Sequence, residues 1–332
     1  MKKINVFITV DTEDSIGGAF KDANLKPVGP EKRVFGEIGN KKYGIPLIMD
    51  IASRYECHIT FFVETVNKYC FGGEETRKVC QYILNHGHDV QLHIHPEYLN
   101  FTLTDPSQMK FSDRIGNYKI EKQIELLREG IRILTENGAP RPIAFRAGGF
   151  AANQDTLNAL RGIGFLIDSS YNRAYLQNPC LFEDNGTNDL NYQNGIWEFP
   201  VTNFIESTKL RPKRFMPMDI NGVDFGEMKY VLNQAKIKGP RNITIVLHSF
   251  SFIKPYDVQY NEVRPRWNVI RRFERLCHFL KEKSDDFEVR TFDSLNQKIL
   301  TQWAQESIHH FPRVPSNLSI MRGFQQLKDI LI

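Results

Sequence analysis

The chain has 332 residues, enough to bury a full-sized core, and its formal net charge of +4 is spread without the long basic run that favours nucleic acid. No stretch approaches the roughly 18 apolar residues of a membrane span, and the N-terminal apolar run stops at Val10, too early for a signal peptide. The five cysteines are odd in number and show no CxxC spacing, which predicts reduced thiols in a cytoplasmic protein.

Strand-type and helix-type segments alternate along the chain. The predicted strands are 4–11, 58–64, 89–95, 143–146, 165–169, 197–201, 243–248 and 288–292. The predicted helices are 43–55, 74–85, 120–136, 154–160, 223–236, 269–282 and 295–305. Such alternation predicts an α/β protein with a parallel sheet, and the lack of a Gly-x-Gly-x-x-Gly after the first strand argues against an open nucleotide-binding sheet. We therefore expect a (β/α) barrel of seven to eight parallel strands.

The loops are long on one side of this barrel only. The long loops are 15–42, 96–119, 170–196, 202–222 and 250–268, and each follows a predicted strand. In a barrel they all lie at the C-terminal ends of the strands, where active sites are built. We expect residues 1–308 to form the barrel, and 309–332 to be an extension whose short helix packs on the barrel or on a second subunit. The oligomeric state stays open.

Two predicted strands end in residues that can hold a metal ion. His93 and His95 are two residues apart, so they point to one face of their strand and make good metal ligands. The first strand runs into Asp11, Glu13 and Asp14, whose charges repel unless a cation, a proton or a helix N-terminus relieves them. Each pattern alone also fits an ordinary surface: two exposed histidines, or a solvated acidic turn.

Three more strands end in polar residues. Arg146 precedes a glycine-rich turn whose N–H groups, at Gly149 and Phe150, could bind an oxyanion. Asp168 ends the fifth strand and His248 the seventh. Taken singly, Arg146 could simply form a salt bridge before a flexible loop, and His248 could simply end its strand. The convergence of five polar strand ends on one rim indicates an active site.

The order of these motifs resembles the polysaccharide deacetylase family, which includes the nodulation-type (NodB-homology) chitin-oligosaccharide deacetylases. The resemblance spans about residues 4–295 and implies a distorted barrel of this kind. The segments that carry it are Thr9-Val10-Asp11-Thr12-Glu13, His93-Ile94-His95, Arg146-Ala147-Gly148, Asp168-Ser169, Trp197-Glu198-Phe199-Pro200-Val201 and Val246-Leu247-His248.

The chain departs from the family pattern at both metal motifs. The family's second aspartate falls on Thr12, so either Glu13 or Asp14 must replace it. The family's second histidine falls near Glu97, so either His95 or Glu97 itself must stand in. The same-face geometry favours Glu13 and His95. The proline of the arginine turn is also replaced, by Ala147-Gly148.

The resemblance implies a hydrolase with a divalent metal, zinc first, that removes an N-acyl group, N-acetyl first, from an amino sugar of a glycan or glycan precursor. Metal ligands would be Glu13, His93 and His95. By resemblance, Asp11 is the general base, Arg146 orients it and His248 is the general acid. Asp168 would position His248 or Arg146, and the N–H groups of Gly149 and Phe150 would stabilise the oxyanion.

The rim loops carry residues suited to a carbohydrate substrate, among them Tyr98, Arg266 and Trp267, which also fit simple loop anchors. Two rival functions stay open. One is another carbon–nitrogen hydrolase on the same scaffold, such as a cyclic-ureide hydrolase or a lipid-linked sugar deformylase. The other is a non-catalytic glycan-binding relative with a degraded metal site. Metal content separates the second rival from the enzymes.

Overall fold

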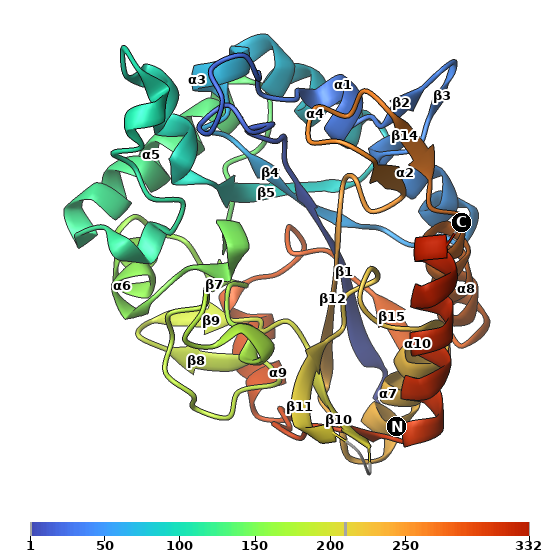
Figure 1. The fold of residues 1–332 in the computed structure, drawn as a ribbon. Helices are drawn as coiled ribbons and strands as arrows, with labels where there is room; N and C mark the ends of the chain where they lie inside the picture. The colour runs from blue at the N-terminus through green and yellow to red at the C-terminus, as the bar shows by residue number, and fades with distance from the viewer. Residues whose placement is uncertain (1, 209–210, 332) are drawn as a thin grey trace.

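The computed structural model describes the backbone of residues 2–208 and 211–331, and their side chains except those of 106, 207–208, 211–212 and 324–331. Its centre is a curled, mostly parallel sheet (Figure 1). The main path runs in the order β12 (Asn242–His248), β1 (Ile4–Thr12), β4 (Thr60–Glu64), β5 (Asp89–Ile94), β6 (Ala144–Ala147), β7 (Ile167–Asp168), β9 (Ile196–Glu198) and β8 (Asn191–Gln193). β15 (Phe287–Val289) pairs with the start of β1.

Each of the eight predicted strands overlaps one of these strands, and all eight are parallel to their neighbours; β8 is antiparallel and was not expected. The predicted distorted barrel is therefore confirmed. Irregular backbone reaches from the β9 side to β12: the N–H of Thr202 donates to the carbonyl of Thr244 at 3.1 Å, and the N–H of Val246 to that of Met218 at 2.9 Å.

Helices cover the outer face of the sheet, as the alternation predicts (Figure 1). The long ones are α2 (Ile45–Arg54), α4 (Gly73–Asn85), α5 (Ile120–Glu136), α6 (Gln154–Gly162), α7 (Phe225–Lys238), α8 (Trp267–Glu282) and α9 (Gln297–Ala304). In α5, Leu127, Ile131 and Leu134 lie on one helix face and are buried in the core. Among the described residues, none of the helices combines the length and the apolar character needed to cross a membrane.

The long loops contain short elements that the sequence does not predict. They include α1 (Pro30–Arg33), α3 (Lys68–Phe71), hairpin β2 (Glu37–Ile38)–β3 (Lys41–Lys42), hairpin β13 (Ile253–Pro255)–β14 (Val263–Pro265) and the 3₁₀ turns η1 (Pro96–Thr102), η2 (Pro106–Gln108), η3 (Ile115–Asn117), η4 (Gly148–Phe150) and η5 (Arg173–Tyr175). A small sheet joins β10 (Asn203–Thr208), β11 (Arg211–Pro217) and β16 (Arg313–Val314). These pieces are short and mostly polar, so they lack the apolar period that marks a core element.

The C-terminal tail forms α10 (Ser316–Leu331). The guanidinium of Arg322 pairs with Glu227 of α7 at 3.0 Å and with Glu206 of β10 at 2.5 Å, so this helix is fastened to the body of the protein. The apolar side chains expected to pack here (Phe324, Leu327, Ile330 and Leu331) lie outside the described side chains. The division into a barrel of 1–308 and an extension of 309–332 stays a prediction.

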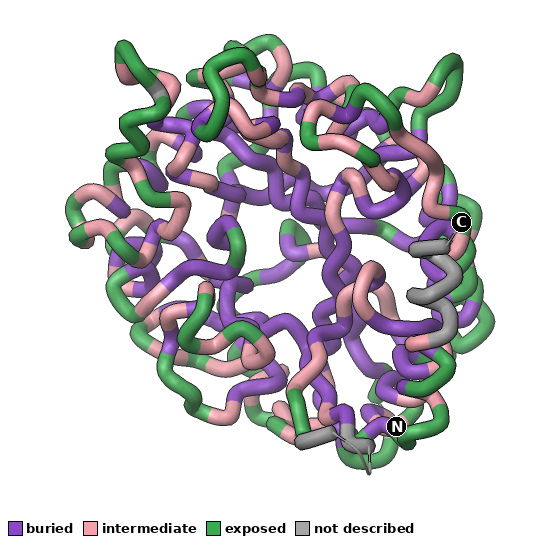
Figure 2. Tube along the Cα trace, viewed as in Figure 1, coloured by how far each residue is buried: buried purple, intermediate pink, exposed green. Residues whose placement is uncertain are grey.

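Strand register brings the polar strand ends into one layer. Asp11 lies opposite His248, Glu64 opposite His93, and His93 opposite Arg146. The strand residues leading up to this layer are buried (Figure 2), because helices cover one face and barrel side chains the other. A rigid core therefore presents the candidate site at one end of the sheet.

Candidate metal centre and active site

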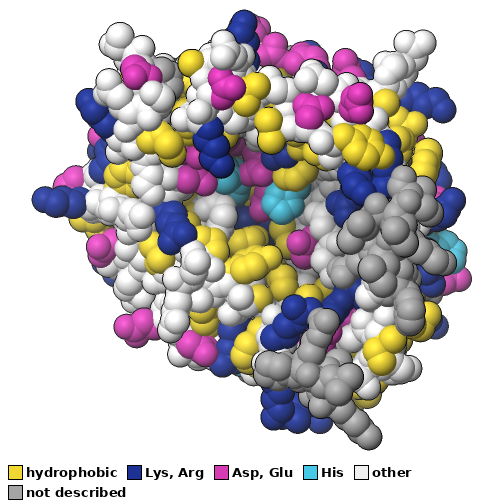
Figure 3. Space-filling view, in the orientation of Figure 1, with side chains coloured by type: hydrophobic (Ala, Val, Ile, Leu, Met, Phe, Trp, Pro, Cys, Tyr) yellow, Lys and Arg dark blue, Asp and Glu magenta, His cyan; other side chains and the backbone are white. Residues whose placement is uncertain are grey.

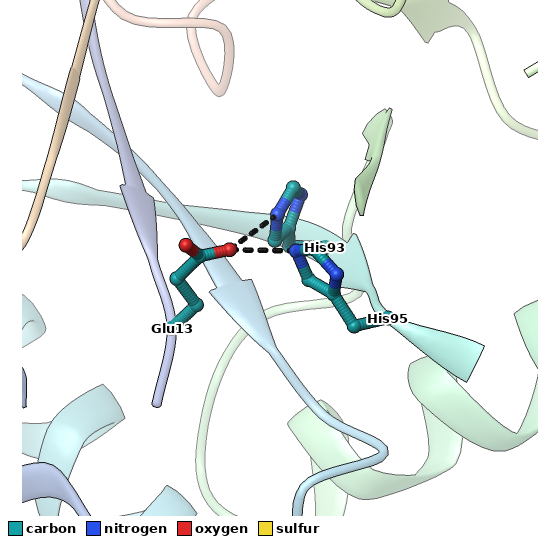
Figure 4. Close-up of side chains that lie close together, drawn as sticks. All are labelled: Glu13, His93 and His95. Carbon is teal, nitrogen blue, oxygen red and sulfur yellow. Dashed lines mark ion pairs between the residues drawn. The ribbon is translucent and has the colours of Figure 1, made fainter. Parts of the chain in front are cut away.

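Three side chains from two strands converge at this end of the sheet. Oε2 of Glu13 lies 2.6 Å from Nε2 of His95 and 3.6 Å from Nε2 of His93 (Figure 4). Glu13 directly follows β1, His93 lies in β5, and His95 lies just beyond β5. One carboxylate oxygen and two imidazole nitrogens are a common ligand set for a divalent ion such as zinc.

Hydrogen bonds at the far side of each ring fix its tautomer. Nδ1 of His93 lies 2.7 Å from the carbonyl oxygen of Arg146, and Nδ1 of His95 lies 2.9 Å from Oδ1 of Asp113. Both partners are acceptors, so Nδ1 carries the proton and Nε2 is left with a lone pair. Within the described residues, both Nε2 atoms are buried without a hydrogen-bond partner. Lone pairs aimed at a carboxylate require a positive charge between them, so these residues fit a metal ion.

The pKa values of the centre agree with this requirement. Burial acts to lower the pKa of His95, but the carboxylates of Asp113 and Glu13 outweigh it and raise that pKa well above its usual value. Burial acts to raise the pKa of Glu13, but His95 and His93 hold that pKa well below its usual value. The cluster therefore keeps its carboxylate ionised and attracts a cation, whether a proton or a metal.

Gly148 makes room for His95. A Cβ atom at position 148 would lie 2.6 Å from Nδ1 and 2.7 Å from Cε1 of the His95 ring, which only glycine avoids. Position 148 is where the resembling family has its proline. The placement of the His95 ring therefore depends on a glycine at position 148.

The alternative ligands are placed differently. The side chain of Asp14 is buried apart from the Glu13 group, with Oδ2 accepting from Nδ2 of Asn67 at 2.7 Å, and burial raises its pKa to about 8. Glu97 groups with His95 and Asp113 rather than with Glu13 and His93. Burial, and then the charge of Asp113, raise the pKa of Glu97 to about 7. The geometry thus groups Glu13, not Asp14, with the two histidines.

Asp11 and Arg146 form a buried ion pair beside this centre. Oδ1 of Asp11 accepts from Nη1 of Arg146 at 2.7 Å, and Arg146 is fully buried. The guanidinium also donates to Oγ1 of Thr9 at 2.9 Å and to Oγ of Ser169 at 2.9 Å, and it lies 4.3 Å from the ring centroid of Phe62. Its donors are therefore used in a fixed geometry that holds Asp11 in place.

His248 lies beside Asp11 across the β1–β12 ladder and is partly exposed. Asp219 makes a parallel bridge to Val246 in the same strand as His248. Burial raises the pKa of Asp219, and the charge of His248 opposes that rise, so the two groups interact. The sequence does not predict Asp219, because it stands in an irregular stretch after β11 without any motif.

Asp168, which we predicted to position His248 or Arg146, lies at the strand end next to Arg146, whose charge acts to lower the pKa of Asp168, and its positioning role stays a prediction. Its carboxylate accepts from Oγ of Ser170 at 2.7 Å and lies beside Glu198, and burial raises the pKa of both acids. Oγ of Ser170 in turn accepts from the N–H of Ala147 at 2.9 Å. The hydrogen bonds of Asp168 in the described chain thus support the strand end next to Arg146, without reaching Arg146 or His248 directly.

The predicted oxyanion turn has an unusual backbone. Gly149 and Phe150 both adopt left-handed conformations, with φ of 56° and 60°, and consecutive residues of this kind are typical of anion-binding turns and functional sites. The ring of Phe150 stacks on Tyr175, with centroids 5.8 Å apart. This turn begins directly after β6, so it lies at the same end of the sheet as the histidines.

The predicted substrate residues differ in access. Trp267 is 51% exposed and packs its edge against Tyr43, so it is available to a ligand. Arg266 is partly buried and donates to Oδ1 of Asn221 at 2.8 Å. Tyr98 is only 2% exposed, because η1 turns it into the core beside Phe101. Contact between the buried Tyr98 and a substrate therefore stays a prediction.

Two further residues of the site are not predicted by the sequence. Asp113, which holds His95, stands in a polar loop before η3. Arg33 of α1 lies 3.3 Å from the ring centroid of Phe250, and its Nη2 lies 3.3 Å from Oε1 of Glu13. Figure 3 shows the histidine and acidic side chains on the floor of a central hollow with hydrophobic groups around it. Loops distant in the sequence thus complete the site.

No family model matches the chain, and no curated protein sequence matches it. A protein from Mycobacterium smegmatis named as a polysaccharide deacetylase superposes with a TM-score of 0.52 at 15% identity, over 95% of this chain and 94% of that one. A family 4 carbohydrate esterase from Streptomyces lividans, in complex with acetate, gives 0.44 at 9% identity, over 93% and 98%. A peptidoglycan deacetylase from Bacillus subtilis gives 0.42 at 11% identity, over 92% and 93%. The first likeness confirms the expected resemblance at the level of the fold.

Proposed function

We propose that the chain is a metal-dependent hydrolase that removes an N-acyl group, N-acetyl first, from an amino sugar of a glycan or glycan precursor. The observation that carries this proposal is the meeting of Glu13, His93 and His95 with the Asp11–Arg146 pair at one end of the sheet. The shared fold with a protein named as a polysaccharide deacetylase supports it.

Zinc is the ion that we propose for Glu13, His93 and His95, since it favours mixed imidazole and carboxylate ligands and leaves positions open in catalytic sites. When bound, such an ion lowers the pKa of water and polarises an amide carbonyl. The remaining work falls to the residues around it.

Asp11 is the proposed general base. As the water oxygen attacks the acyl carbon, the Asp11 carboxylate takes its proton, and Arg146 holds that carboxylate in position. The N–H groups of Gly149 and Phe150 would donate to the oxygen that becomes negative. The carbon–nitrogen bond then breaks, and His248 gives a proton to the departing sugar amine. Asp219, whose charge interacts with that of His248, would assist it.

The cytoplasmic location is part of the same proposal. All five cysteines are free, and four of them are buried, which suits a reducing compartment. A cytoplasmic enzyme would act on a soluble or lipid-linked amino sugar or glycan precursor, with Trp267 offering an exposed aromatic face to the sugar.

A substrate screen tests the proposal. N-acetylated and N-formylated amino sugars and their oligomers, with a cyclic ureide as comparison, are incubated with metal-loaded protein and scored for the released acid or ring-opened product. We expect acetate from amino sugars with wild type and almost none with Asp11→Asn. Release of formate alone, or opening of the ureide alone, would favour another carbon–nitrogen hydrolase. A protein that binds metal and sugars yet releases nothing would favour the non-catalytic alternative.

A further inference from the structure

A second group of oxygen atoms lies behind the candidate metal centre, between the ends of β1 and β4 and the first turns of α4. The small cavity there is lined by the polar side chains of Thr12, Asp14, Glu64, Asn67, Glu75 and Thr76. Its lining holds three carboxylates and no basic side chain, and apolar residues close its walls. The free space, measured to the centre of a water-sized sphere, is about 10 Å³, room for one water molecule or one ion.

Several oxygens of this cavity lack a partner. Among the described residues, Oδ1 of Asp14, Oδ1 of Asn67 and Oγ1 of Thr76 are buried without a hydrogen bond. Oε2 of Glu75 also has no hydrogen bond, but it lies 3.9 Å from Nζ of Lys78. The residues Asp14, Asn67 and Thr76 are 4%, 8% and 3% exposed. Unsatisfied buried polar atoms are rare and call for an explanation, and a group of them around one cavity indicates a missing ligand.

The N–H donors described around this cavity already have acceptors, and the Thr76 hydroxyl is a donor that does not. Nδ2 of Asn67 donates to Oδ2 of Asp14 at 2.7 Å, and this bond fixes Oδ1 of Asn67 as an acceptor facing away. Glu64 accepts from the N–H of Val66 at 2.6 Å and from the N–H of His95 at 2.5 Å. A water molecule could accept from the Thr76 hydroxyl and donate to two of the oxygens, but it would leave the carboxylate charge of the cavity unbalanced, whereas a cation would balance that charge.

We propose that Asp14, Asn67, Glu75 and Thr76 form a second cation site, for a hard ion of the Ca²⁺ or Mg²⁺ class. All its ligand atoms are oxygens, which Ca²⁺ and Mg²⁺ prefer, whereas zinc favours nitrogen and sulfur ligands. Ca²⁺ is the first choice, because it accepts carboxylate, amide and hydroxyl oxygens in irregular geometry. The site is separate from the Glu13, His93 and His95 group, which holds nitrogen ligands.

The position of this site gives it a structural role. Asp14 directly follows Glu13, and Glu64 holds the backbone of His95. An ion at Asp14 would therefore tie the ends of β1 and β4 to α4 and steady the two loops that carry Glu13 and His95. The proposal stands on the cavity alone and does not depend on the proposed reaction.

Thermal unfolding in cation-depleted buffer tests the site. The full chain is titrated with CaCl₂ and MgCl₂, with NaCl as an ionic-strength control. We expect CaCl₂, or MgCl₂ in its place, to raise the Tm of wild type by a few degrees when the free cation concentration is about 100-fold above its Kd. Asp14→Asn and the nearly isosteric Thr76→Val should lose most of this rise, and Thr76→Val keeps the test open if Asp14→Asn fails to fold.

Two controls separate this site from others. Asp22→Asn removes an exposed carboxylate from the same loop and should respond like wild type. Glu13→Gln should keep the CaCl₂ response even after it loses the transition metal. A wild type whose Tm ignores both divalent salts would mean that the cavity holds only water and would overturn the proposal. An undiminished response in both Asp14→Asn and Thr76→Val would place the ion elsewhere, with the same consequence.

Discussion

The two ends of β5 both carry histidines, yet they are chemically opposite. At the N-terminal end, Nδ1 of His88 accepts from the N–H of Ile59 at 3.2 Å, so the proton sits on Nε2, and the neighbouring rings are those of Phe61 and of another histidine, His58. At the C-terminal end, Nδ1 of His95 faces Asp113 and its Nε2 faces Glu13. The tautomers are reversed, and only the C-terminal pair offers lone pairs to a cation.

The pKa values follow the same division. Burial, and then the charges of His58 and His86, lower the pKa of His88 to about 4, whereas carboxylates raise that of His95. A histidine in this fold therefore becomes a metal ligand through the carboxylates that neighbouring loops bring to it. Those loops follow the C-terminal ends of parallel strands, which is why one end of β5 is a site and the other is core.

The largest expected effect concerns Asp11, at the C-terminal end. Asp11→Asn should lower kcat by about 10²–10⁴-fold, because it removes the proposed base, while metal content stays at the wild-type level. Steady-state kinetics and elemental analysis on the same preparation check both halves, with Asp22→Asn as an exposed control. Loss of metal in Asp11→Asn would show that Asp11 is a ligand and would remove it as a free base.

His248 should affect both rate and pH dependence. We expect His248→Ala to lower kcat by about 10²-fold or more and to flatten the basic limb of the kcat/KM profile, since no other group then protonates the amine. Asp219→Asn should lower kcat less than His248→Ala does, and it should shift the basic limb of the kcat/KM profile. An unchanged basic limb in His248→Ala would return His248 to a residue that merely closes β12.

Asp113 tests the comparison through its hydrogen bond with His95. Asp113→Asn weakens the acceptor that orients His95, so metal affinity should fall by about 10–100-fold, while kcat at saturating metal changes less. Competition with a chromogenic chelator measures the affinity. Glu97→Gln is the matched control, because Glu97 lies beside Asp113 but does not hydrogen-bond to His95 among the described contacts. Equal affinity in Asp113→Asn and wild type would contradict this role.

The N-terminal end should affect stability alone. A neutral, buried His88 has a folded pKa of about 4 against 6.5 when unfolded, so the unfolded chain binds more protons between these values. The free energy of unfolding should therefore drop as pH falls from 6.5 to 4, and His88→Gln should flatten this drop while leaving turnover unchanged. Urea unfolding at several pH values measures it, and an identical slope in both proteins would refute the assignment.

The sequence predicts the core of the molecule better than its rim. The eight strands and the grouping of His93 with His95 follow from period and alternation, which are local signals. Asp113, Asp219 and Arg33 reach the site from long loops, where no period marks them, and Tyr98 reads as a rim aromatic although η1 buries it. The coupling of Gly148 to His95 is visible only in space.

The metal content of His95→Ala, measured beside His88→Ala and Glu97→Ala by elemental analysis, tests the central claim most directly. We expect wild type to carry about one zinc-like ion per chain, in keeping with the three-residue ligand set of Glu13, His93 and His95. His88→Ala and Glu97→Ala should keep that ion, and His95→Ala should lose it. Full metal in His95→Ala, or its loss in Glu97→Ala, would contradict the account.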